Sequence, residues 1–432
     1  MTYLLAGLIL LALPILVNLL RASPQRRRWA FTAIGMLPLL TKLPIEGYLY
    51  GWAEWQGTAR GFNLSLIVII SLALIATRAR SRAMLPFFTL FALYALALFM
   101  SVFFASVWLA TVFVWWQFLS VLVVFVAIGY EAHKPEIRAS ILSGFALGLI
   151  YQAINLVPQK LSGVVQAAGT FGHQNILGLA VELTLFPIVA AALGGDRRRI
   201  LLLGIASAVT CIAGSGSRAT MGIAGAAIIL LILLSLARRT TSRKIGIAFF
   251  GVVSLAAATP IAIGTLNDRF QGGSFFTTED ERKGFENVAR SMAEKHPLGV
   301  GANQFVIVSN RDGYADRFGI PWQMADRSMP AHNAYLLARA ETGWLGEIAF
   351  ILMIAVPMMM ALRFSFRDRN HAGGDILLGS AVALLANMVH NSYEFAVHTF
   401  PIQLLLFINI GLIASELNYR KMVSRQARMK RE

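Results

Sequence analysis

One histidine and three arginines are the residues of this chain whose type and setting best suit chemistry. His332 lies in the stretch "MPAHNAYLLARAETGWLGE" (329–347), directly before Asn333, which predicts the N-cap of a helix that begins at Ala334. Histidine has an unperturbed pKa near neutrality, as a general base at physiological pH requires. We therefore predict that His332 is a catalytic base held at the start of a helix, with a purely structural histidine as the alternative.

The three arginines are candidates for anion binding. Arg218 opens a predicted helix directly after "SGS", so serine hydroxyls, backbone N–H groups and a guanidinium converge there. Arg282 precedes Phe285 by three residues and so lies on or beside the apolar face of another predicted helix. Arg290 lies on another face of that helix and is the competing candidate. The alternatives are a snorkelling interfacial arginine for Arg218 and a buried salt bridge for Arg282.

Several other polar residues lie at or near the same surface. In "AGTFGHQNILGLA" (168–180), Asn175 either caps the helix that follows or, with His173, lines a polar mouth. Glu182 lies inside the next apolar span, where a carboxylate usually faces a cavity or a partner such as an arginine. Arg339 and Glu341, in the stretch that contains His332, are candidates for either a structural role or a lining role.

The elements that must position these residues are hydrophobic helices. Of the 432 residues, 57% are hydrophobic and only 14% are charged, against roughly 25% charged in soluble globular proteins. Apolar runs of about 17–25 residues are typical of membrane-spanning helices. We predict an all-α, polytopic transmembrane helical bundle of 12 or 13 spans, forming a single integral membrane domain over residues 1–432. The predicted spans are 3–20, 29–42, 62–77, 84–105, 107–129, 139–156, 175–194, 200–213, 219–237, 245–264, 344–362, 374–390 and 400–417.

The distribution of charge predicts the orientation of this bundle. Lysines and arginines gather in alternate connections, for example around residues 21–28, 197–199 and 238–244, so these connections share one side of the membrane. The positive-inside rule makes that side cytoplasmic. Topology and contact with anionic membrane lipids therefore account for the net charge of +16, and we expect no nucleic-acid partner. The single cysteine, Cys211, excludes a disulfide framework and a cysteine metal site.

The longest connection on the opposite side, residues 265–333, has the character of a structured loop. It carries eight basic and nine acidic residues and is close to neutral. Thr278 and Glu281 have the spacing of a capping box, and "HPLGVG" (296–301) ends the helix that would follow. Apolar residues at helical spacing, beginning at Phe285, predict that this helix packs on the membrane domain. We interpret "GVGAN" (299–303) as a turn, since no strand precedes it.

Taken in order, the motifs "GTFGHQN", "SGSRA", "HPLGVGANQF" and "HNAYLLARAETGWLGE" resemble those of the O-antigen ligase and O-antigen polymerase superfamily of bacterial envelopes. The resemblance is densest over residues 168–350. It implies transfer of a glycan from undecaprenyl pyrophosphate to a hydroxyl of lipid A–core or of another glycan. The enzyme would be inverting, independent of metal and cofactor, and active on the periplasmic face of the bacterial inner membrane.

The resemblance also implies roles for individual residues. Arg218 and Arg282 match the arginines expected to hold the pyrophosphate, and His332 matches the expected base. Gln174 departs from the proline often found at that position in the family. The acceptor is not evident from the residues, so O-antigen ligation is the first hypothesis and polymerisation of repeat units is the second. A lipid-linked glycan transporter is a third hypothesis, which predicts internal repeats and polar groups through the membrane midplane; the sequence shows no clear repeat.

Overall fold

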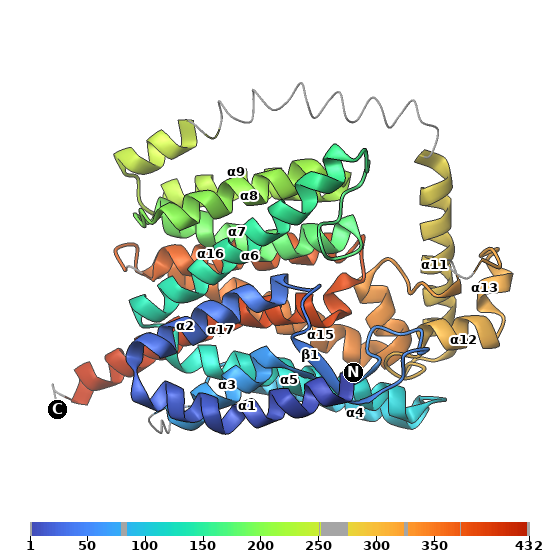
Figure 1. The fold of residues 1–432 in the computed structure, drawn as a ribbon. Helices are drawn as coiled ribbons and strands as arrows, with labels where there is room; N and C mark the ends of the chain where they lie inside the picture. Colours follow the sequence, from blue (N-terminus) through green and yellow to red (C-terminus); the bar gives the residue numbers. More distant parts are fainter. Residues whose placement is uncertain are drawn as a thin grey trace.

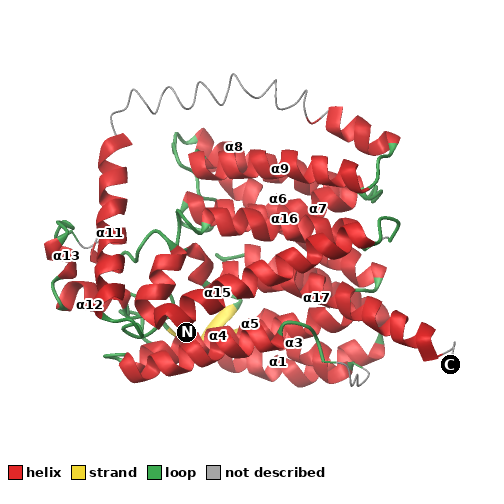
Figure 2. Ribbon diagram, turned by 180° about the vertical axis from the view of Figure 1, so that it is seen from behind, coloured by secondary structure: helices red, strands yellow, loops and turns green. Residues whose placement is uncertain are grey.

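The computed structural model describes residues 2–78, 84–249, 251, 275–323, 327–371 and 373–429. Nearly all of these residues belong to helices that run side by side as a bundle (Figures 1 and 2). The longer helices are α1 (Thr2–Ala22), α2 (Pro24–Met36), α3 (Leu66–Thr77), α4 (Phe88–Ser101), α5 (Trp108–Glu131), α6 (Pro135–Leu161), α7 (Gln174–Leu193), α8 (Arg199–Ser215), α9 (Arg218–Arg238), α11 (Phe275–Lys295), α15 (Ala334–Arg367), α16 (Gly374–His390) and α17 (Phe400–Met429). Short helical segments are η1 (Leu37–Leu39), η2 (Val102–Phe104), α12 (Phe305–Arg311), α13 (Tyr314–Arg317) and η3 (Ala396–His398).

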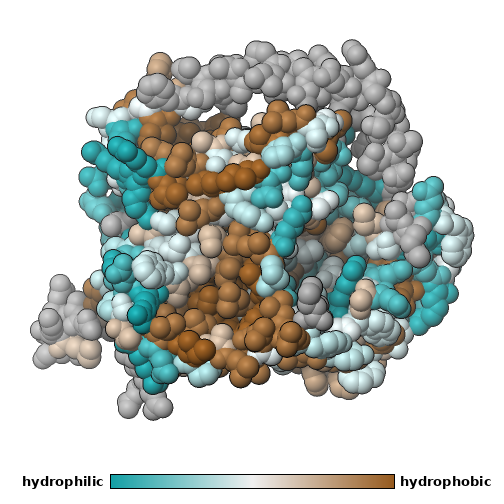
Figure 3. All heavy atoms as spheres, viewed as in Figure 1, coloured by the Kyte–Doolittle hydropathy of each residue, from teal (hydrophilic) through white to brown (hydrophobic). Residues whose placement is uncertain are grey.

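The predicted all-α polytopic bundle is confirmed. Among the described residues, seven helices are long and apolar enough to cross a membrane, namely α1, α5, α6, α7, α9, α15 and α17. Shorter apolar helices are α3, α4, α8 and α16. Figure 3 shows hydrophobic residues across the middle of one face and hydrophilic residues toward the two ends, as expected for a protein with a membrane-spanning band. The predicted span 245–264 lies mostly outside the described residues.

Helix α7 forms the centre of the bundle. It packs against α16, α8, α9, α6 and α17, and its residues from Leu177 to Leu193 are buried.

Small residues allow some helices to approach closely at the periphery of the bundle. A side chain on Gly144 of α6 would collide with the backbone oxygen of Thr32 in α2, so glycine is required where these two helices meet. In α7, by contrast, the apolar residues that suit a membrane span also form the core of the bundle.

A two-stranded antiparallel hairpin, β1 (Glu46–Gly51) and β2 (Gly61–Ser65), was not predicted. The predicted span 62–77 is therefore wrong at its start, because helix α3 begins only at Leu66. Aromatic residues favour the extended backbone here. Phe62 packs edge-on against Phe113 and Trp116 at ring-centroid distances of 5.1 and 5.7 Å, so tertiary packing outweighs the helical pattern of this apolar run.

The described part of the predicted loop, residues 275–323 and 327–333, is structured, as predicted. Helices α11, α12 and α13 form a small core of their own with the start of α15, built around residues such as Phe285, Val288 and Met292. Helix α11 begins at Phe275, three residues before the predicted cap Thr278, so the prediction of that N-cap is wrong. No glycine or proline lies between these two positions, so nothing prevents the helix from starting at Phe275. Side chains 275–281 and residues 252–274 are outside the described residues.

One end of the bundle, which we name the basic end, carries the clustered arginines and lysines at the C-terminal ends of α5, α7, α9, α15 and α17. Many of these residues are also ion-paired with acidic side chains of neighbouring helices. Arg238 contacts Asp375 at 2.7 Å, and Glu416 contacts Arg420 at 3.2 Å. Other pairs are Arg27–Glu131, Lys134–Glu131, Arg138–Glu416, His371–Glu416, Lys244–Asp375 and Arg198–Asp196. Figure 1 shows the C-terminus at this end and α11–α13 at the opposite end.

Candidate functional site

The start of α15 lies at the end of the bundle opposite the basic end, and its geometry confirms one local prediction. Asn333 is the N-cap of α15: its side-chain oxygen accepts hydrogen bonds from the backbone N–H groups of Tyr335 and Leu336, both at 3.1 Å. The backbone N–H of Ala334 donates to the carbonyl of Asn391 at 2.8 Å. This junction fixes the residue before the cap, His332, against the segment that follows α16.

His332 faces a carboxylate that the sequence analysis did not single out. Its Nδ1 lies 3.4 Å from Oε1 of Glu394, and the side chains are only 12% and 1% exposed. The two groups lie within salt-bridge distance, but Nδ1 has no hydrogen-bond partner of good geometry among the described residues. Phe285 of α11 and Phe395 pack edge-on against the imidazole at 6.1 and 5.5 Å between ring centroids. The ring is thus held between two aromatic side chains.

Glu394 is the centre of a polar cluster. Its Oε2 accepts a hydrogen bond from Nδ2 of Asn175 at 3.0 Å, and its Oε1 accepts one from the backbone N–H of Phe395 at 3.0 Å. The Nδ1 of His173 lies 3.9 Å from Oε2. Burial raises the pKa of this carboxyl, but His332 together with Asn175 and His173 outweighs burial and lowers the pKa from 4.5 to about 2. Glu394 is therefore a buried, ionised group.

The N-terminus of α7 contradicts one of the two alternatives for Asn175, that it caps the helix. The N-cap is His173, whose Nδ1 accepts a hydrogen bond from the backbone N–H of Asn175 at 3.3 Å. The side chain of Asn175 points inward instead, because Glu394 and Ser217 satisfy its amide. Burial lowers the pKa of His173; Glu394 opposes this shift, and the positive charges of His332 and Arg282 add to it.

Arg218 begins α9 next to this cluster. Ser217 caps the helix, accepting from the backbone N–H of Thr220 at 3.2 Å, and donates its hydroxyl to the side-chain oxygen of Asn175 at 2.8 Å. A continuous chain of polar contacts therefore runs from Ser217 through Asn175 and Glu394 to His332. Arg218 is exposed and directly follows the first member of this chain. The predicted base and one predicted anion ligand are thus brought to one end of the bundle.

The structure separates the two arginines of α11. Arg282 is half-buried and lies one turn before Phe285, which contacts His332. Its positive charge acts on the pKa of His173, so its guanidinium is within electrostatic reach of the cluster. Arg290 is exposed and pairs with Glu286 on its own helix at 3.4 Å. Of the two, Arg282 is the one placed beside the cluster.

Glu341 and Arg339 have partners outside the cluster. The Glu341 carboxylate accepts from the backbone N–H of Phe305 at 3.0 Å, and its backbone oxygen accepts from Gly301 at 2.9 Å. Glu341 therefore holds the "GVGAN" segment, which is a turn as predicted. The guanidinium of Arg339 stacks on the ring of Trp344 at 3.4 Å from the centroid. These contacts favour structural roles for both residues.

A kink in α15 supports the same loop. Gly343 has φ 68° and ψ −171°, a conformation that is essentially restricted to glycine. A side chain there would lie 2.5 Å from the backbone oxygen of Pro297. Gly343 therefore packs closely against the loop that follows α11. The kink thereby fixes α11, and with it Arg282, over the start of α15.

The sequence analysis missed two further residues, His390 at the end of α16 and Glu394 just beyond it. His390 contacts Glu182 at 3.0 Å, and both side chains are fully buried, so the partner of Glu182 is a histidine and not an arginine. Glu394 lies four residues beyond His390, in "HNSYEF" (390–395). A run of polar residues at the end of an apolar span is the signal that could have found them. Among the residues that the structure describes, no group of three or more His, Cys, Asp or Glu side chains is arranged to hold a metal ion.

Fold and site together define a multi-pass helical membrane protein with a buried histidine–carboxylate cluster and two adjacent arginines at one end of the bundle. Residues 202–351 match the family model described as O-Antigen ligase. The match covers 150 of the 432 residues and agrees with the resemblance to the O-antigen ligase and polymerase superfamily that the motifs carry. The matched region contains Arg218, Arg282 and His332, whereas His173 and Glu394 lie outside it. No curated protein matches the chain.

Proposed function

We propose that this protein is an inverting glycosyltransferase that moves a glycan from undecaprenyl pyrophosphate to an acceptor hydroxyl, with O-antigen ligation to lipid A–core as its reaction. The observation that carries the proposal is the contact of His332 with the ionised Glu394 at the end of the bundle where Arg218 and Arg282 also lie. The family match supports an activity of the ligase or polymerase type. The finer assignments below are argued from the chemistry of these residues.

His332 would act as the general base. Its Nδ1 faces Glu394, which leaves Nε2 as the atom that accepts the proton of the attacking hydroxyl. A base of this kind contributes roughly 10²–10⁴-fold to the rate. The buried negative charge of Glu394 would orient the imidazole and stabilise the imidazolium that forms, the role of the third group in a nucleophile–base–carboxylate arrangement. The proton then leaves His332 to water.

Arg218 and Arg282 would hold the leaving group. The acceptor oxygen forms a bond to the anomeric carbon while the bond from that carbon to the pyrophosphate oxygen breaks, and the electron pair moves to the pyrophosphate. Two guanidinium groups stabilise the developing negative charge through bidentate hydrogen bonds, which are stronger away from bulk water. Attack on the face opposite the pyrophosphate inverts the anomeric centre. The products are the extended acceptor and undecaprenyl pyrophosphate.

The proposed site lies on the periplasmic side of the inner membrane. Clustered arginines and lysines at the basic end mark the cytoplasmic side by the positive-inside rule. Helix α15 runs from the site at Ala334 to the basic end at Arg367, and its part beyond the kink at Gly343 has 24 residues, or about 36 Å at 1.5 Å per residue. This length is enough to cross a bilayer, so the cluster and the basic end lie on opposite faces.

Deletion of the gene, followed by analysis of lipopolysaccharide and lipid-linked glycans, tests this function. Ligation predicts lipid A–core without O-antigen and long polymer left on undecaprenyl pyrophosphate. Core that carries a single repeat unit would instead indicate a polymerase. Unchanged lipopolysaccharide with missing exopolysaccharide would contradict ligation. Purified protein that joins lipid-linked glycan to lipid A–core in detergent would exclude a role limited to transport.

A further inference from the structure

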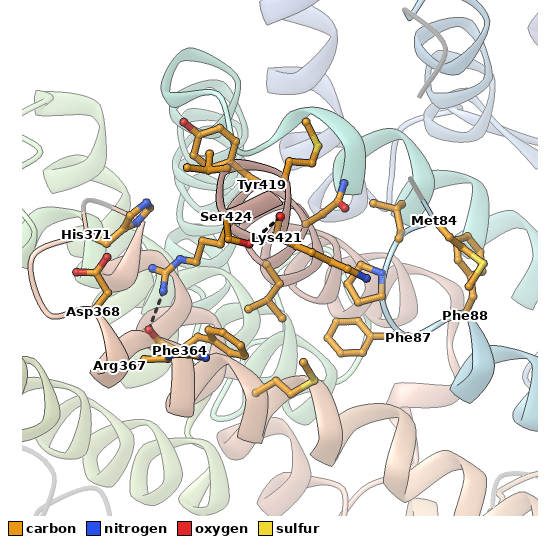
Figure 4. Close-up of a pocket in the computed structure, with 18 of the residues that line it drawn as sticks. Met84, Phe87, Phe88, Phe364, Arg367, Asp368, His371, Tyr419, Lys421 and Ser424 are labelled. Atoms are coloured by element: carbon orange, nitrogen blue, oxygen red, sulfur yellow. Dashed lines mark hydrogen bonds between the residues drawn. The ribbon is translucent and has the colours of Figure 1, made fainter. Parts of the chain in front are cut away.

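A large cavity lies far from the proposed catalytic site. Its volume is about 1140 Å³, and it is lined by the start of α4 with the residues before it, the end of α15, His371 and the C-terminal part of α17 (Figure 4). Phe364, one of the lining residues, lies 21 residues beyond the kink of α15 at Gly343, or roughly 30 Å of continuous helix from that kink. The cavity therefore opens at the basic end and cannot serve the chemistry of His332.

One wall of the cavity is apolar. Met84, Phe87 and Phe88 contribute from the α4 side and Phe364 from α15, and Figure 4 shows Met84 and Phe88 together at one edge of the cavity. Met84 has 72% of its surface exposed. Burial of such an apolar surface from water by a hydrocarbon chain is favourable. This wall therefore suits an acyl chain.

The rest of the lining is basic. Arg367 and Lys421 are exposed, Arg420 is partly buried, and Asp368 is the acidic residue among the lining side chains. Arg420 donates through Nη1 to the carbonyl of Phe364 at 2.8 Å and through Nε to Glu416. Its Nη2 is buried without a hydrogen-bond partner among the described residues. The cavity thus offers two exposed cationic groups, Arg367 and Lys421, to an anion, beside Arg420, which is paired with Glu416.

We infer that this cavity binds an anionic glycerophospholipid. The headgroup phosphate would lie between Arg367, Arg420 and Lys421, and an acyl chain would follow Met84 and Phe364 into the bilayer. Basic pockets between helices on the cytoplasmic side are a recognised setting for anionic lipid headgroups. The volume slightly exceeds the roughly 300–1,000 Å³ of ordinary ligand pockets, which suits a headgroup with part of its chains. A free phosphate ion would leave the apolar wall uncovered.

Native mass spectrometry of the full-length protein, with phosphatidylglycerol and phosphatidylcholine titrated in detergent, tests the inference. The wild-type protein is expected to retain phosphatidylglycerol in preference to phosphatidylcholine. Each Lys or Arg close to the lipid phosphate contributes about fivefold to the affinity for an anionic lipid. The double variant Arg367→Gln, Lys421→Gln is therefore expected to bind phosphatidylglycerol about 25-fold more weakly. The matched double variant Arg363→Gln, Arg239→Gln removes two exposed arginines that do not line the cavity and is expected to stay within about twofold of wild type.

A second variant tests the apolar wall without any change of charge. Thr89→Trp, at an exposed lining position of α4, fills part of the cavity and is expected to lower retention of phosphatidylglycerol while thermal unfolding without added lipid stays unchanged. Equal retention of the two lipids by the wild-type protein would overturn the inference. An equal loss in both double variants, or inorganic phosphate that displaces the lipid at millimolar concentration, would overturn it as well.

Discussion

Replacement of Glu394 by glutamine separates the proposed chemistry from simple packing. Glutamine keeps the size of the side chain and one acceptor oxygen, so either Asn175 or the backbone N–H of Phe395 keeps its hydrogen-bond partner. The negative charge 3.4 Å from Nδ1 of His332 is lost. If Glu394 orients His332 and stabilises its protonated form, the Glu394→Gln variant must be slow in the proton-transfer step while it still binds the donor.

The size of the effect follows from this single contact. A hydrogen bond or close contact to a charged group contributes about 1.5–3 kcal/mol. Because each 1.36 kcal/mol of barrier is a factor of ten in rate, the loss of Glu394 is expected to slow turnover by about 10- to 150-fold. The variant should still bind the donor, whereas loss of a residue that only supports packing would weaken donor binding as well.

The assay is single-turnover transfer from a lipid-linked glycan to lipid A–core by purified protein, measured from pH 5 to pH 9. Glu394→Asp keeps the charge and should restore part of the rate. Glu286→Gln is the control, because among the described residues this partly exposed carboxylate of α11 pairs with Arg290 and not with the cluster. A Glu394→Gln variant with a rate within about twofold of wild type would refute the role of Glu394.

Three further predictions concern the elements around the site. Gly343→Ala should lower the free energy of unfolding by about 2–3 kcal/mol in a thermal or denaturant measurement, because its φ of 68° suits only glycine; Gly222→Ala, with open space around it, should change little. Arg282→Gln should weaken donor binding at least tenfold in a filter or fluorescence assay, whereas Arg290→Gln should not, and equal effects of the two would contradict the assignment. Because the pKa of Glu394 is lowered from 4.5 to about 2, its carboxylate stabilises the fold by about 3 kcal/mol above pH 4.5. This stabilisation should fade as the pH falls from about 4.5 to about 2. The free energy of unfolding of a Glu394→Gln variant should therefore fall less than that of the wild type over this pH range.

Features determined by neighbouring residues along the chain were predictable. The apolar runs gave helices close to the expected bounds, because hydrophobic length and periodicity are local properties. The N-cap at Asn333 and the apolar face of α11 that begins at Phe285 were predicted for the same reason. The local signal also placed His332 at the start of a membrane helix.

Features that depend on distant pairing were not predictable. Asn175 has the sequence of a helix cap, yet its amide is taken by Glu394, which lies 219 residues away along the chain. The strand at 61–65 has an apolar composition that also suits a helix, and packing of Phe62 on α5 decides the outcome. The basic residues that follow the positive-inside pattern also form ion pairs such as Arg238–Asp375. No local pattern contains the partner in any of these cases.

The most direct test of the central claim is a His332→Ala variant in which transfer and donor binding are measured on the same preparation. The account predicts that single-turnover transfer falls by the roughly 10²–10⁴-fold contributed by a general base. The dissociation constant for the lipid-linked donor should stay within about threefold of wild type, since Arg218 and Arg282 still hold the pyrophosphate. Transfer at the wild-type rate would contradict the account, and so would a loss of transfer that is explained entirely by a loss of donor binding.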